Sequence, residues 1–119
     1  MIKLTGHDLT LEEIRKIVLQ GEKVVLSDEA KARIQANRQT VEEMIDKGQT
    51  MYGINTGFGK FSDCVISNKD LKTLQLNLIR SHACAVGDPF PEIVSRAMVL
   101  LRLNALLKGY SGIRPLIAE

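Results

Sequence analysis

Residues 97–107 read AMVLLRLNALL, and Arg102 and Asn104 are the only polar side chains among them. Pro91 precedes this run and suits the first turn of a helix, so we expect a helix over about 91–108. A helix that is apolar on nearly all sides must be surrounded by other elements. The sequence therefore predicts that this helix packs in a larger bundle or an oligomer, where Arg102 and Asn104 pair with groups on neighbouring helices.

Two helices are expected in the first part of the chain. Thr10 and Glu13 have the spacing of a capping box, in which each side chain satisfies a free backbone N–H, and this predicts a helix over about 10–20. Ser27 is a good N-cap, and the apolar residues that follow it recur every three or four positions. This pattern predicts a second helix over about 28–47.

A third helix is expected after the middle of the chain. Ser67 and Asp70 are interpreted as a second capping box, and leucines at helical spacing follow them. Gly87 can adopt the left-handed conformation that ends a helix. We therefore expect this helix over about 68–86.

The fold class predicted from these patterns is mainly α, with at most one or two short strands. Residues 23–26 are β-prone, but they are too isolated to define a sheet. Residues 113–119 resemble the cap and first turn of another helix. Between the predicted helices, residues 49–67 lack any helical period and are expected to form a loop.

Composition excludes several classes of protein. The 119 residues, 45% of them hydrophobic, fit one domain with one modest core. A net charge of +2 and an aromatic content of 4% disfavour nucleic-acid binding. No apolar run approaches the roughly 20 residues of a membrane span, and the first residues do not resemble a secretory signal, so a cytoplasmic location is expected.

The two cysteines are expected to be small buried side chains. Cys64 and Cys84 lack the spacing of a zinc site or of a disulfide framework, so neither a metal nor a disulfide is predicted. His7, in a polar stretch near the start of the chain, is expected to be a solvated surface group.

Residues 52–60 read YGINTGFGK and carry the strongest chemical signal. A phosphate-binding P-loop is excluded, because Ile54 stands where that pattern needs its first glycine and Phe61 where it needs Ser or Thr. The dinucleotide-binding pattern fails as well, because Ser62 occupies its third glycine position. The loop can instead expose the phenol of Tyr52 beside backbone N–H groups.

The remaining loop residues are expected to shape the loop and to take no part in chemistry. They are Gly53, Asn55, Thr56, Gly57 and Gly59. From the residues alone, an ordinary loop tyrosine is the favoured interpretation of Tyr52, because one phenol beside glycines is a weak signal. His82 could likewise be a hydrogen-bonded core histidine on the apolar stripe of its helix.

Three separated segments, in order, resemble the aromatic amino acid ammonia-lyase family. They are the loop 52–59, the stretch 74–87 (LQLNLIRSHACAVG) and the stretch 104–114 (NALLKGYSGIR). The resemblance covers essentially the whole chain. It implies the helical amino-terminal part of the ammonia-lyase fold, with a glycine-rich active-site loop. Ser81-His82-Ala83 resembles the branch that acts on histidine.

The resemblance also implies an activity and its residues. The reaction is the non-oxidative elimination of ammonia from L-histidine, which gives trans-urocanate. Tyr52 matches the catalytic base and His82 matches a histidine of the substrate pocket. The family uses a methylidene-imidazolone (MIO) group, which forms from an Ala-Ser-Gly tripeptide, and its members are homotetramers. This sequence contains no Ala-Ser-Gly, so residues 1–119 are expected to be a fragment of a larger lyase domain and inactive alone.

Two alternatives remain from the sequence. One is a fragment of a phenylalanine or tyrosine ammonia-lyase or of an aminomutase. The other is a non-catalytic helical module that associates with itself through the apolar residues 97–107.

Overall fold

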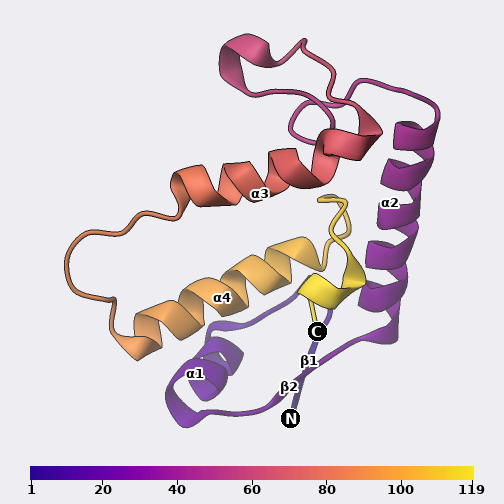
Figure 1. Cartoon of the computed structure of the whole chain (residues 1–119). Coiled ribbons are helices and arrows are strands. Elements are labelled where there is room, and N and C mark those ends of the chain that lie inside the picture. Colours follow the sequence, from indigo (N-terminus) through magenta and orange to yellow (C-terminus); the bar gives the residue numbers. More distant parts are fainter. The chain divides into compact units, whose positions relative to one another are not determined.

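The computed structural model describes residues 1–119, and its fold is mainly helical, as predicted (Figure 1). The elements are, in order, β1 (Ile2–Leu4), α1 (Leu11–Gln20), β2 (Val24–Leu26), α2 (Asp28–Asp46), two 3-10 turns (Gly59–Phe61 and Asn68–Asp70), α3 (Leu71–His82), α4 (Glu92–Leu106) and a last 3-10 turn (Pro115–Ile117). None of these helices combines the length and the apolar content needed to cross a bilayer.

The chain divides into two compact units. The first unit contains Met1–Glu42 and Pro89–Glu119, and the second contains Glu43–Asp88. The buried apolar core lies entirely in the first unit: it consists of Leu4, Val18, Ala30, Ile34, Leu100, Leu106, Leu107 and Ala118. The second unit buries only two polar side chains, those of Asn55 and Thr56.

A small parallel sheet joins the start of the chain to residues 24–26. β1 pairs with β2, with Ile2 opposite Val24 and Leu4 opposite Leu26, and α1 connects the two strands. The sequence indicated only β2, because a very short strand at the terminus does not show a period of two. Pairing with β2 accompanies burial of Leu4 in the core of the first unit.

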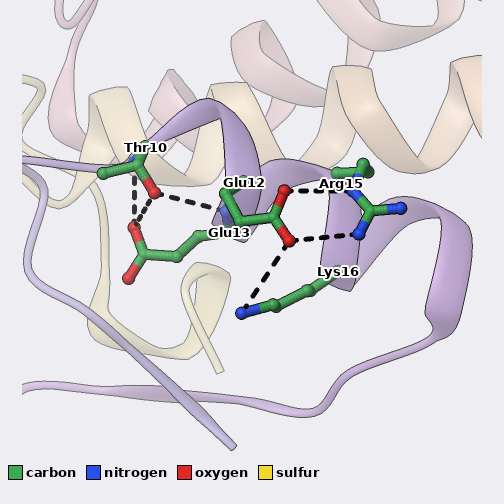
Figure 2. A network of polar contacts seen from close by, with 5 residues as sticks. All are labelled: Thr10, Glu12, Glu13, Arg15 and Lys16. Atoms are coloured by element: carbon green, nitrogen blue, oxygen red, sulfur yellow. Dashed lines mark hydrogen bonds and ion pairs between the residues drawn. The ribbon is translucent and has the colours of Figure 1, made fainter.

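The capping box at the start of α1 forms as predicted (Figure 2). The Thr10 hydroxyl accepts a hydrogen bond from the Glu13 N–H at 3.2 Å, and a Glu13 carboxylate oxygen accepts from the Thr10 N–H at 2.9 Å. The bond from the Thr10 backbone, and then that from its hydroxyl, lowers the pKa of the Glu13 carboxyl. Beside it, a side-chain hydrogen bond from Arg15 lowers the pKa of Glu12.

Helix α2 ties together distant parts of the first unit. Ser27 caps it as predicted, with its hydroxyl accepting the Ala30 N–H at 3.0 Å. Arg33 donates to the carbonyl of Leu107 at 3.2 Å, just after α4, and also to the carbonyl of Thr5. These bonds join residues from the two ends of the chain into one unit.

Helix α4 leaves much of its apolar surface uncovered within these residues. Leu100 and Leu106 are buried, but Met98, Val99 and Leu101 are exposed. Asn104 was predicted to pair with a group on a neighbouring helix. Within this chain its Oδ1 has no such partner: the atom is buried and makes no hydrogen bond.

Helix α3 is shorter than the 68–86 predicted. The Ser67 hydroxyl donates to the Asp70 carboxylate at 2.6 Å and caps no N–H, so a 3-10 turn precedes the α-helix. A capping box uses Glu or Gln, and Asp is one methylene shorter.

The end of α3 also comes earlier than predicted. The Cys84 N–H donates to the His82 carbonyl at 2.8 Å. Between them, Ala83 has φ -76° and ψ 62°. This combination is an inverse γ-turn, and it ends the helix before Gly87.

Two further expectations differ from the structure. Cys64 and Cys84 are both exposed, not buried, and neither belongs to the core of the first unit. The helix expected near 113–119 is a single 3-10 turn. His7 is exposed, as predicted.

Candidate active site

Asn55 organises the loop between α2 and α3. Its side chain is 3% exposed and makes two short hydrogen bonds: Oδ1 accepts the Met51 N–H and Nδ2 donates to the Gln49 carbonyl, each at 2.7 Å. An amide can do both at once because it carries a donor and an acceptor on one group. Asn55 thereby ties the backbone that precedes Tyr52 to the turn that follows it.

The rest of the loop closes on itself. Thr56 forms an isolated antiparallel bridge with Val65, flanked by the Gly57 N–H to the Cys64 carbonyl (3.0 Å) and the Ile66 N–H to the Asn55 carbonyl (2.8 Å). The segment enclosed by these bonds has the length of an Ω-loop, a compact surface loop whose ends lie close together.

Two glycines of the loop occupy positions where a side chain would be strained or would clash. Gly53 has φ +75°, in the left-handed region that side chains disfavour. At Gly57, an added Cβ would lie 2.7 Å from both the Cβ and the carbonyl oxygen of Phe61. The loop conformation therefore depends on glycine at both positions.

Tyr52 is largely exposed to solvent on this loop. Its side chain is 65% exposed, and its ring meets Phe58 edge to face, with 6.1 Å between the ring centroids. The phenol makes no hydrogen bond within the chain. It is therefore free to reach a group that these residues do not supply.

Helix α3 carries the second candidate residue. His82 is the last residue of the helix and is exposed, so it lies outside the core formed by these 119 residues. Its Nδ1 lies 2.9 Å from the hydroxyl of Ser81 and 3.0 Å from the carbonyl oxygen of Leu78. Nε2 makes no hydrogen bond within the chain.

The structure connects the two candidates without bringing them into contact. Gln75 Nε2 donates to the carbonyl of Gly53, next to Tyr52, at 3.5 Å. His82 lies further along α3 on the same face, two turns or about 10 Å along the axis. The loop residue next to Tyr52 and the helix that carries His82 are thus joined by one hydrogen bond in the second unit.

Gln75 was not predicted to contribute to this site, and Ser81 was noted only as part of the Ser81-His82-Ala83 resemblance. Gln75 is one of several polar residues on α3, and nothing in its spacing indicates a contact with the loop. Ser81 carried a signal, because a serine in the last turn of a helix commonly bonds a carbonyl three or four residues back.

The other chemical features of the chain lie outside this site. An open hollow of about 510 Å³ adjoins α1 and α4 in the first unit, lined by residues such as Ile17, Val99 and Leu103. The glutamates with lowered pKa values also belong to the first unit. No three His, Cys, Asp or Glu side chains are grouped so that they could hold a metal ion.

Comparison with known proteins gives consistent matches. Residues 9–119 match the family model described as aromatic amino acid lyase. The histidine ammonia-lyase of Geobacillus sp. (strain WCH70) is 56% identical over all 119 residues, which correspond to 23% of that relative. The chain therefore spans about a quarter of the length of the curated relatives it matches.

Solved structures of a tyrosine aminomutase and of a histidine ammonia-lyase share the fold of this chain. The tyrosine aminomutase from Streptomyces globisporus matches with a TM-score of 0.91 at 34% identity, covering 98% of this chain and 22% of that one. The histidine ammonia-lyase from Trypanosoma cruzi matches with a TM-score of 0.83 at 44% identity, covering 95% of this chain and 22% of that one.

Proposed function

Since the chain belongs to the aromatic amino acid lyase family, we propose that its residues serve an enzyme that eliminates ammonia from L-histidine to give trans-urocanate. The observation that carries this proposal is the 56% identity with a histidine ammonia-lyase along the entire chain. Ser81-His82-Ala83 supports it, because it resembles the branch that acts on histidine.

In this proposal Tyr52 is the base. In the elimination, the Tyr52 oxygen acts in its deprotonated, phenolate form and takes up a β-proton of the substrate. The electron pair of that C–H bond forms the double bond between Cα and Cβ, and the bond between Cα and the amine breaks so that ammonia leaves with its electron pair. The Tyr52 oxygen is exposed and has no partner within the chain, so it is free to approach such a proton. The loop bonds of Asn55 hold the backbone beside it and so keep its position fixed.

His82 is proposed to contact the substrate side chain. It lies about 10 Å along α3 from Gln75, which bonds the loop. Substrate contact at one end and proton transfer at the other would orient the substrate between them.

The family's MIO group would supply the electrophile that activates the amine as a leaving group. The chain has no Ala-Ser-Gly from which the group could form, but its exposed Tyr52 side chain, unbonded within the chain, is open to a substrate that residues outside this chain also hold. We therefore propose that other parts of a homotetrameric, cytoplasmic enzyme hold the group, and that residues 1–119 alone are inactive. Incubation of the chain with L-histidine should give no urocanate absorbance, and reproducible turnover would contradict this.

A chimera tests the proposal directly. These 119 residues replace the aligned segment of the Geobacillus sp. relative, which supplies the rest of the site. We expect urocanate formation, and a loss of about 10² to 10⁴ in turnover for Tyr52→Phe in the chimera, the range typical of a general base. Tyr110→Phe is the matched control, because Tyr110 is the only other tyrosine and is also exposed. Equal effects of the two substitutions would contradict the role of Tyr52.

The match to a tyrosine aminomutase keeps a lyase or aminomutase for phenylalanine or tyrosine as the alternative within the family. A substrate panel separates the two, since the chimera should prefer L-histidine and lose that preference with His82→Leu or His82→Phe. A preference for tyrosine or phenylalanine in the unsubstituted chimera would favour the alternative.

A second candidate, self-association without catalysis, is favoured by the uncovered side of α4, where Val99 is 69% exposed. Size-exclusion chromatography with light scattering would show a dimer or larger species that Val99→Lys dissociates. A monomer at all concentrations would refute this candidate.

A further inference from the structure

Three polar groups meet at the end of α3. The Ser81 hydroxyl donates to the Leu78 carbonyl at 2.9 Å. His82 Nδ1 lies 2.9 Å from that hydroxyl oxygen and 3.0 Å from the same carbonyl oxygen. Each distance is within hydrogen-bonding range, so the protons on these groups are mutually constrained.

The arrangement selects one tautomer of His82. A carbonyl oxygen can only accept, so an unprotonated Nδ1 at 3.0 Å from it would place two lone pairs against each other. A protonated Nδ1 donates instead to the Leu78 carbonyl and to the Ser81 oxygen, whose own proton is used toward Leu78. In the neutral ring, Nε2 then carries the lone pair.

We propose that Ser81 is a positioning residue that holds His82 in the Nδ1–H tautomer and so makes Nε2 a hydrogen-bond acceptor for an N–H group of the substrate. This inference rests on the proposed function. The imidazole of L-histidine offers such a donor, whereas the side chain of phenylalanine does not. A site that hydrogen-bonds a substrate N–H rejects the analogue that lacks it, because its own polar group is left unpaired.

Nitrogen NMR of the 119-residue chain with labelled histidine tests the tautomer without turnover. The chain has two histidines, and the exposed His7, whose ring makes no hydrogen bond within the chain, is the internal reference. At a pH where both rings are neutral, His82 should show a protonated Nδ1 and an unprotonated Nε2. In Ser81→Ala the ratio of the Nδ1–H to the Nε2–H form should fall about fivefold, the change expected for one net hydrogen bond.

Two further variants sharpen the test. Ser81→Thr keeps a hydroxyl at the same place and should retain the original ratio, whereas Ser95→Ala, an exposed serine on α4, should leave His82 unchanged. An unprotonated Nδ1 in the unsubstituted chain, or an unchanged ratio in Ser81→Ala, would overturn the proposal.

Activity of the chimera separates this inference from the proposed function. We expect Ser81→Ala to raise KM for L-histidine several-fold and Ser81→Thr to restore it. If the unsubstituted chimera eliminates ammonia from L-histidine while His82 is in the Nε2–H form, the role of Ser81 is wrong and the function stands. If the tautomer is as expected but the chimera does not act on L-histidine, the proposed function is wrong. The proposal that Nε2 of His82 accepts a hydrogen bond from the imidazole N–H of L-histidine is then also refuted.

Discussion

Replacement of Asn55 by alanine should loosen the loop that presents Tyr52. The substitution removes the acceptor of the Met51 N–H and the donor to the Gln49 carbonyl, each at 2.7 Å. Asn55 is 3% exposed, so water does not readily replace either partner. Each bond contributes a net stabilisation of about 1 kcal/mol. Loss of both should therefore lower the free energy of local opening of the loop by about 2 kcal/mol.

Amide hydrogen exchange measures this opening directly. Because about 1.4 kcal/mol corresponds to a factor of ten, we expect protection of the Met51 amide to fall about 30-fold. The Ile66 amide, which donates to the Asn55 carbonyl, should lose protection with it. Asn68→Ala is the control, since Asn68 is exposed and its side chain makes no hydrogen bond. Exchange at Met51 within threefold of the unsubstituted chain, or equal to the control, would refute this reasoning.

Three other perturbations have expected outcomes. Thr10→Ala removes a capping box and should lower the free energy of unfolding by about 0.5–2 kcal/mol in urea titrations. The pKa of Glu13 is lowered from its ordinary value of 4.5 in the folded state, so its stabilisation is present above that pH and is lost as the pH falls. The effect of Thr10→Ala should therefore be smaller at pH 3 than at pH 7. Gly57→Ala forces a Cβ against the Cβ and carbonyl oxygen of Phe61. This overpacking should destabilise the loop by about 1–3 kcal/mol and raise its exchange rates accordingly.

The controls for these perturbations are exposed positions of the same kind. Thr73→Ala, on the exposed surface of α3, should cost less than Thr10→Ala, and an equal cost would contradict the capping argument. A Thr10→Ala effect that grows on acidification would contradict the sign of the Glu13 contribution. Ser62→Ala, in the same loop as Gly57, should leave exchange unchanged, and a similar response of both variants would contradict the steric argument.

Local signals in the sequence were sufficient for most of the helices. The capping box at Thr10 and the N-cap at Ser27 act within one turn, so their positions follow from spacing alone. Ser67 shows where this reasoning fails, because the Asp70 carboxylate captures the Ser67 hydroxyl itself. The β1–β2 pair was missed because each strand's evidence is a partner on the far side of α1, not a local pattern.

The candidate site was predicted in part. The residue types and glycine spacing of the loop indicated Tyr52 and its neighbours, and the structure shows how Asn55 and Gly57 support that loop. The contact of Gln75 with Gly53 is a tertiary hydrogen bond, which spacing along one helix does not reveal. The roles of Tyr52 and His82 stay predictions that the chimera tests.

The first unit is built from two separate parts of the chain, and this affects the order in which its core can form during synthesis. Arg33 and Asn37 bond to partners 74 and 75 residues later, at Leu107 and Gly112. The second unit, Glu43–Asp88, lies between these two parts in the sequence and is synthesised before the α4 residues of the first unit. At about 5–20 residues per second, its synthesis alone leaves Leu4 and Ile34 without their α4 partners for roughly 2 to 9 s. Nascent chains of this protein therefore carry uncovered apolar surface for seconds, a period in which chaperone binding competes with aggregation.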